Sequence, residues 1–133
     1  MSLLGIGVDL VHIPSIDDQL SMPGTRFASV FTAGERREVR GRPDGPAPHL
    51  AARWAAKEAV IKAWSASVYG GPPLTGGDIH NQIEVINDAW GRPAIGVRGR
   101  VAELTAGATF KVSLSHDGDY AIAYVAMVAD DDL

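Results

Sequence analysis

The sequence predicts an α+β fold in which a mostly antiparallel sheet is wrapped by one long helix and several short ones. Three observations lead to this class. Apolar residues alternate or run continuously near both ends of the chain, which is typical of strands. One central stretch, 49–66, keeps a helical apolar period over several turns. The remaining elements are short and are separated by loops rich in proline and glycine, which favours hairpins over crossover connections.

The length and composition predict a single domain spanning residues 1–133. Apolar residues make up 46% of the chain, which is enough to build a core. The sequence has no cysteine, which excludes disulfides, thiolate zinc sites and a cysteine nucleophile. The N-terminus lacks a basic signal-peptide segment and no apolar run is long enough to cross a bilayer, so we expect a cytoplasmic protein without a membrane partner. A net charge of −4 does not favour binding to the phosphate backbone, so we expect no nucleic-acid partner.

The first predicted strand, 3–11, places an acid in an apolar setting. One face of this strand holds large apolar residues, and the other holds Asp9 together with Gly5 and Gly7. Because glycine has no side chain, another backbone or a ligand can come close on that face. Taken alone, Asp9 is compatible with an edge-strand residue that faces water.

The shorter elements are predicted from the prolines and glycines that interrupt the chain and from the alternation of apolar and polar residues. In chain order they are a helix between Pro14 and Pro23, a helical turn at 25–31, a helix at 33–40, a strand at 79–87 paired with 94–97, a short helix at 99–106, and strands at 109–115 and 120–128. Thr32 and Glu35 form a capping box that begins the helix at 33–40. The strand at 120–128 is apolar throughout, which predicts cover on both faces. An acidic tail, 130–132, is expected to lie in solvent.

The long helix presents three different surfaces. An apolar sector and a smooth, alanine-rich sector are suited to packing, the second at very short range. Glu58 and Lys62 share a charged sector one turn apart, whereas Lys57 projects on the side of Arg53. Charges are costly to bury unless something pairs with them, and a metal ion and a polyphosphate would be such partners.

Asp9 and Glu58 together predict a Mg²⁺ site. Each alone could be an ordinary surface carboxylate, but both lie in segments that otherwise form a core. A Mg²⁺ site commonly needs only one or two carboxylates, completed by substrate phosphates and water. Lys62 would add a cation beside the metal. The alternative is an ordinary pair with Glu58 at i,i+4, which contributes only a few tenths of a kcal/mol.

His116 closes a strand in a Ser-His-Asp-Gly turn. A lone histidine at a strand end is usually structural. The neighbouring serines invite a hydrolase interpretation, but the sequence has no Gly-x-Ser-x-Gly elbow to support it. His12 and His49 lack zincin spacing and His80 is isolated, so zinc is not predicted.

Five sequence pieces, spread over essentially the whole chain, carry a family resemblance. In order they are Gly5-Ile-Gly-Val-Asp9-Leu-Val, Phe27 through Thr32-x-x-Glu35, Arg53-Trp-Ala-Ala-Lys57-Glu58-Ala-x-x-Lys62-Ala, Gly91-Arg-Pro93 and Val112-Ser-Leu-Ser-His116. With these pieces in this order the chain resembles the holo-acyl-carrier-protein synthases, the small type of 4′-phosphopantetheinyl transferase. The piece around Lys57 and the piece that ends at His116 are each moderately specific, and the five pieces in order are strongly specific.

The resemblance implies the fold of that family and its reaction. The family transfers 4′-phosphopantetheine from coenzyme A to a serine of an acyl carrier protein, or of a carrier domain in a fatty acid synthase, and releases adenosine 3′,5′-bisphosphate. Asp9 and Glu58 match the Mg²⁺ ligands of the family, Lys62 the lysine near the pyrophosphate, and His116 a histidine near the nucleotide. Glu58 and Lys62 would be catalytic, and either Glu58 or a metal-bound water would deprotonate the serine. The family form is a homotrimer with shared active sites, used in fatty acid biosynthesis.

Carrier docking and two other functions stay open at this point. Many relatives carry basic residues after the first strand, where this chain has Asp17 and Asp18. Docking would then rely on Arg26, Arg36, Arg37 or other surfaces. The alternative functions are a small Mg²⁺-dependent nucleotide hydrolase and a noncatalytic binding module with the same fold.

Overall fold

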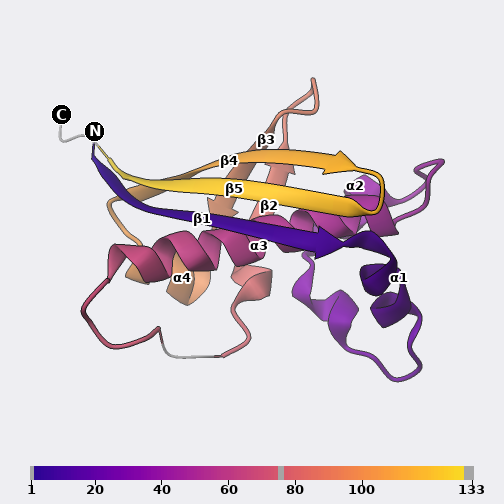
Figure 1. Ribbon diagram of the computed structural model, residues 1–133, viewed down its shortest axis with the longest axis horizontal. Coiled ribbons are helices and arrows are strands. Elements are labelled where there is room, and N and C mark those ends of the chain that lie inside the picture. The colour runs from indigo at the N-terminus through magenta and orange to yellow at the C-terminus, as the bar shows by residue number, and fades with distance from the viewer. Residues whose placement is uncertain (1, 75–76, 131–133) are drawn as a thin grey trace.

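A three-stranded antiparallel sheet lies across one long helix (Figure 1). The computed structural model describes residues 2–74 and 77–130, so the end of the expected acidic tail, 131–132, lies outside the described residues. The sheet has the order β1-β5-β4, built from β1 (Leu3–His12), β4 (Ala108–Asp117) and β5 (Tyr120–Ala129). The helix is α3 (Ala47–Ser67), and Pro48 lies in its first turn, where a proline is tolerated. The predicted α+β class is confirmed.

The remaining elements flank this pair of layers. They are α1 (Ile13–Ser21), the 3₁₀ turn η1 (Phe27–Val30), α2 (Ala33–Val39), the 3₁₀ turn η2 (His80–Gln82), the hairpin β2 (Ile83–Asn87) with β3 (Pro93–Val97), and α4 (Gly99–Leu104). The strand predicted from 79 therefore starts four residues late. The reason is local, because the N–H of Gln82 donates to the carbonyl of Ile79 at 3.0 Å and closes a turn there.

The close approach of β1 to α3 depends on the two glycines of the first strand. A Cβ added to Gly5 or Gly7 would overlap the backbone carbonyl of Ala63 or Ala59, respectively. These alanines are fully buried, so the smooth sector of the helix and the glycine face of the strand fit together. The packing fixes β1 along α3 and brings the segment after Gly7 beside the middle of the helix.

The sheet is covered on one face only. Along β5, Ala121, Ala123 and Val125 are buried against the rest of the fold. The residues that alternate with them point the other way, and of these Ile122 is 39% exposed and Tyr124 is 49% exposed. The prediction that β5 is covered on both faces is therefore wrong for the isolated chain.

The other face of the sheet, here called the outer sheet face, is apolar. It holds Ile6, Val8 and Leu10 on β1 and Tyr120, Ile122 and Tyr124 on β5, all exposed. An exposed apolar surface of this kind marks a binding or self-association site more often than a solvated one. Within the two described ranges, no helix is both long and apolar enough to span a bilayer.

Candidate active site

Asp9 and Lys62 meet where β1 crosses α3. Nζ of Lys62 donates to Oδ1 of Asp9 at 3.0 Å and to the carbonyl of Val8 at 3.0 Å. The Asp9 side chain is only 17% exposed, which rules out a freely solvated edge residue, whereas Lys62 is 53% exposed. The ammonium group therefore pairs across the fold with the strand acid. The alternative interpretation, a simple pair with Glu58 along the helix, is not what the structure contains.

Glu58 lies one turn before Lys62 on the same edge of α3. Its Oε1 is 3.0 Å from Nε2 of His80, and the His80 ring stacks on Trp54 with centroids 4.7 Å apart. The Glu58 side chain is 29% exposed, so it is accessible but held. Asp9 thus contacts Lys62, and Glu58 contacts His80.

The two acids suit a hard, oxygen-preferring cation. No group of three histidine or carboxylate side chains within residues 2–74 and 77–130 could hold a metal unaided. Mg²⁺ is usually bound through only one or two carboxylates, and water and substrate phosphates supply the rest. Asp9 already accepts a cationic group from Lys62, which shows that positive charge is accommodated there. Asp9 and Glu58 both offer oxygen donors of the kind that Mg²⁺ prefers, so the chemistry of these two side chains fits that ion.

His116 lies in a separate cavity of about 230 Å³ between the start of α3, the β2–β3 turn and the end of β4. The cavity is also lined by Arg53, which is only 4% exposed. Nη1 of Arg53 donates to the carbonyl of His49 at 3.1 Å, while its Nε has no partner among the described residues. Burial lowers the pKa of Arg53, and the nearby Glu35 opposes that shift. Because this Nε is itself buried, it adds to the cost of burying the guanidinium and offers no donor to the cavity.

The predicted residues thus fall into two groups on one chain. Neither Asp9 nor Lys62 is among the described residues that line the His116 cavity. Arg53 and Lys62 are separated by about two and a half helical turns, which directs them to opposite sides of α3. Likewise, β1 and β4 are the two edge strands of the sheet. The Asp9–Lys62 pair and the His116 cavity are therefore built from different edges of the sheet and from different sides of α3.

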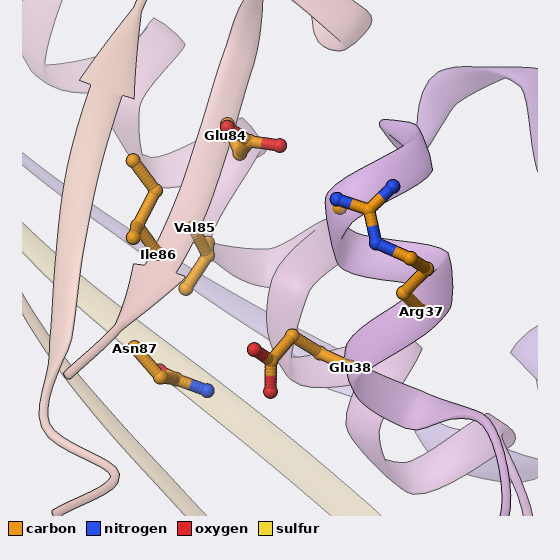
Figure 2. A pocket seen from close by; sticks show the side chains of 7 residues that line it. Arg37, Glu38, Glu84, Val85, Ile86 and Asn87 are labelled. Atoms are coloured by element: carbon orange, nitrogen blue, oxygen red, sulfur yellow. The ribbon is translucent and has the colours of Figure 1, made fainter. Parts of the chain in front are cut away.

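A larger cavity of about 420 Å³ lies between α2 and β2 (Figure 2). Figure 2 shows Arg37 and Glu38 on the helix opposite Glu84 and Asn87 on the strand. Its lining mixes one arginine with two carboxylates, so its charge favours no single class of ligand. None of the predicted site residues lines it.

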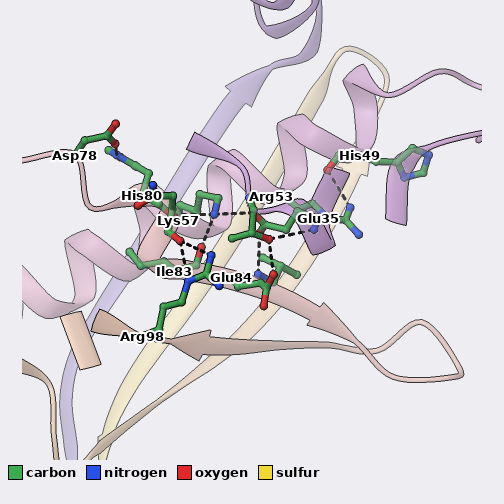
Figure 3. Close-up of polar contacts among 12 residues, drawn as sticks. Glu35, His49, Arg53, Lys57, Asp78, His80, Ile83, Glu84 and Arg98 are labelled. Carbon is green, nitrogen blue, oxygen red and sulfur yellow. Dashed lines mark hydrogen bonds and ion pairs between the residues drawn. The ribbon is translucent and has the colours of Figure 1, made fainter. Parts of the chain in front are cut away.

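Lys57 is not part of the ligand site. It is fully buried, and its Nζ lies 2.7 Å from Oε1 of Glu35, donates to the carbonyl of His80 at 2.9 Å and also contacts the carbonyl of Ile83 (Figure 3). Glu35 in turn accepts from the backbone N–H of Val85 at 2.8 Å. Burial lowers the pKa of Lys57, and Glu35 counteracts it. The ammonium group of Lys57 is therefore neutralised inside the protein by Glu35. Its contacts, together with those of Glu35, connect α2, α3 and β2.

Sequence reasoning missed His80 and the Glu35–Lys57 pair. The capping box at Thr32 and Glu35 is confirmed, with Thr32 N–H donating to Glu35 Oε1 at 2.9 Å. Nothing in that local motif indicates that the Glu35 carboxylate also pairs with Lys57, which lies on α3. His80 follows a breaker-rich loop, and its contact with Glu58 exists only after folding.

Comparisons with known proteins identify the family to which the chain belongs. Residues 5–125 match the family described as the 4′-phosphopantetheinyl transferase superfamily. The chain belongs to this superfamily. It is 50% identical over 129 residues to the holo-[acyl-carrier-protein] synthase of Mycobacterium bovis (strain BCG / Pasteur 1173P2), covering 97% of this chain and 99% of the relative.

Solved structures of synthases have the same fold as this transferase. The ACPS–CoA complex of Chronobacterium ammoniagenes superposes with a TM-score of 0.86 at 46% identity, covering 95% of this chain and 97% of that one. The acyl carrier protein synthase of Mycobacterium tuberculosis gives 0.80 at 45% identity, covering 96% and 99%. The predicted family and the prediction of an enzyme, a phosphopantetheinyl transferase of the holo-acyl-carrier-protein synthase type, are confirmed.

Proposed function

We propose that this transferase moves 4′-phosphopantetheine from coenzyme A to a serine of an apo acyl carrier protein, or of a carrier domain, in a Mg²⁺-dependent reaction of fatty acid biosynthesis. The observation that carries the proposal is the contact of Lys62 with Asp9, with Glu58 one turn away on the same edge of α3. Two acids and a mobile cation are the groups that a diphosphate substrate requires. We further propose that the reaction takes place in the cytoplasm.

The reaction replaces the phosphoanhydride bond of coenzyme A by a phosphate ester bond to serine. The serine Oγ bonds to the β-phosphorus, the bond from that phosphorus to the bridging oxygen breaks, and the oxygen leaves on adenosine 3′,5′-bisphosphate. The serine proton passes to a base. Charge builds on the phosphate oxygens, so catalysis is mainly positioning and electrostatic stabilisation.

Each proposed residue has one task in this scheme. Asp9 and Glu58 would hold Mg²⁺, which when bound neutralises diphosphate charge and orients the phosphates. Lys62 is half exposed and is anchored only at its tip, so its ammonium can turn from Asp9 to the leaving phosphate. Glu58 is also a candidate for accepting the serine proton. His116 would contact the nucleotide, and the positive charge of Arg53, which lines the same cavity, would favour one of its phosphates.

We also propose that the chain works as a homotrimer with active sites shared between neighbours. The outer sheet face provides an apolar surface for association, and His116 borders it through a second cavity shared with Leu10 and Ile122. Heterologous contacts can close into a ring, and we propose that in this ring the β4 edge of one copy lies beside the β1 edge of the next. Such an arrangement would bring His116 of one copy toward Asp9 of its neighbour.

Mass spectrometry of an apo carrier protein mixed with this chain, coenzyme A and Mg²⁺ tests the reaction. The expected result is a carrier that gains the mass of one phosphopantetheine and loses that gain when its acceptor serine is replaced by alanine. Omitting Mg²⁺ should abolish the gain. Cleavage of coenzyme A with no change in the carrier would instead favour the nucleotide hydrolase alternative.

A further inference from the structure

His80 contacts Glu58 in a way that defines which atom carries the proton. Nε2 of His80 lies 3.0 Å from Oε1 of Glu58. Carboxylate oxygens accept hydrogen bonds, so we assign the ring proton of this bond to Nε2 of His80. The bond engages one of the two carboxylate oxygens. It therefore limits rotation of the Glu58 side chain, which is otherwise flexible and partly exposed.

His80 is itself held at both its ring and its backbone. The ring stacks on Trp54 at 4.7 Å with the planes 25° apart. The backbone carbonyl of His80 accepts from Nζ of Lys57 at 2.9 Å, and Lys57 is fixed by its buried pair with Glu35, as Figure 3 shows. A chain of contacts thus runs from the buried Glu35–Lys57 pair to the partly exposed carboxylate of Glu58.

We infer that His80 is a positioning residue that holds the Glu58 carboxylate ready for Mg²⁺. The inference rests on the proposed metal role of Glu58. Groups that hydrogen-bond a metal ligand orient it and reduce the ordering that binding requires. His80 does not touch the substrate in this role and acts only through Glu58. Its replacement should therefore weaken metal binding more than it slows the reaction at saturating metal.

Binding of Mn²⁺ alone, measured by electron paramagnetic resonance on the full chain, separates this role from a general effect on folding. His80→Phe keeps an aromatic ring to stack on Trp54 but removes the donor. It should weaken Mn²⁺ binding by about 10-fold or more. His80→Gln can still donate from a similar position and should stay within about 3-fold of the unaltered chain. Glu103→Gln, an exposed carboxylate on α4, is the matched control and should change nothing.

Transfer kinetics provide the second measurement. The apparent affinity of His80→Phe for Mg²⁺ should fall by the same factor as Mn²⁺ binding, while kcat at saturating Mg²⁺ should remain within about 3-fold. Unchanged Mn²⁺ affinity in His80→Phe would overturn the inference. An equal loss in His80→Gln would also overturn it, because the ring and not the hydrogen bond would then matter. Absence of Mn²⁺ binding by the unaltered chain would overturn the proposed metal site as well.

Discussion

Nζ of Lys62 lies 3.0 Å from Oδ1 of Asp9, although 53 residues separate them in the sequence. The contact shows that the first strand and the central helix bring their charged groups to the same place. It also shows that Lys62 reaches across to the strand, since it contacts the carbonyl of Val8 as well. The lysine is therefore poised beside the proposed cation site and is exposed enough to turn toward a substrate.

Lys62→Ala should lower kcat much more than it weakens coenzyme A binding. The ammonium group would stabilise charge that develops on the leaving phosphate, and loss of one such group typically costs about 100-fold or more in rate. Steady-state transfer assays combined with calorimetric titration of coenzyme A measure the two effects. Arg100→Ala removes an exposed cation on α4 and is the control. A variant with weakened binding and normal kcat would make Lys62 a binding residue only.

Lys57→Met should destabilise the fold without removing a substrate contact. The substitution leaves the carboxylate of Glu35 buried without its cation, which typically costs about 3–5 kcal/mol. Urea denaturation measures the loss. Adding Glu35→Leu should recover part of it, because the uncompensated charge is then gone, although the bond to Val85 N–H is lost too. A loss below about 1 kcal/mol in the single variant would show that the pair is not a main stabiliser.

The outer sheet face should control the oligomeric state. Tyr124→Lys puts a charge in the middle of the apolar surface opposite Val8, and burying it in an interface would be costly. Light scattering coupled to size-exclusion chromatography should then detect smaller species than for the unaltered chain. Tyr69→Lys, at a side chain 91% exposed beyond the end of α3, is the control and should leave the assembly intact. An unaltered assembly in Tyr124→Lys would place the interface elsewhere.

Mixing two inactive variants tests whether the active site is shared. Glu58→Gln and His116→Ala should each fold and each lose most transfer activity. After subunit exchange in an equal mixture, one neighbour pair in four combines an intact Glu58 from one copy with an intact His116 from the next. About a quarter of full activity should therefore return. The transfer assay on mixed and unmixed samples measures this. Normal turnover by Glu58→Gln alone would contradict its role, and no recovery on mixing would assign both residues to one copy.

Particular residues show how far the sequence could predict this molecule. The glycines at 5 and 7 and the alanines of α3 predicted close packing, because small side chains leave a geometric signature in the pattern. The pairing of Lys62 with Asp9 and the partnership of His80 with Glu58 could not be predicted, because each depends on which segments the fold brings together.

The apolar run of β5 was misleading for a related reason. It predicted burial on both faces, whereas in the isolated chain Ile122 and Tyr124 remain exposed on the outer sheet face. An apolar sequence pattern does not distinguish residues that pack within a chain from residues that form an exposed apolar surface. The helix motif likewise placed Lys57 among the charges needing a partner, but only the fold identifies that partner as Glu35.

Anomalous diffraction from crystals grown with coenzyme A and Mn²⁺ tests the central claim most directly. The account predicts one strong metal peak bonded to both the Asp9 and Glu58 carboxylates and to oxygens of the diphosphate. A metal bound elsewhere, with these two carboxylates far from the diphosphate, would contradict it.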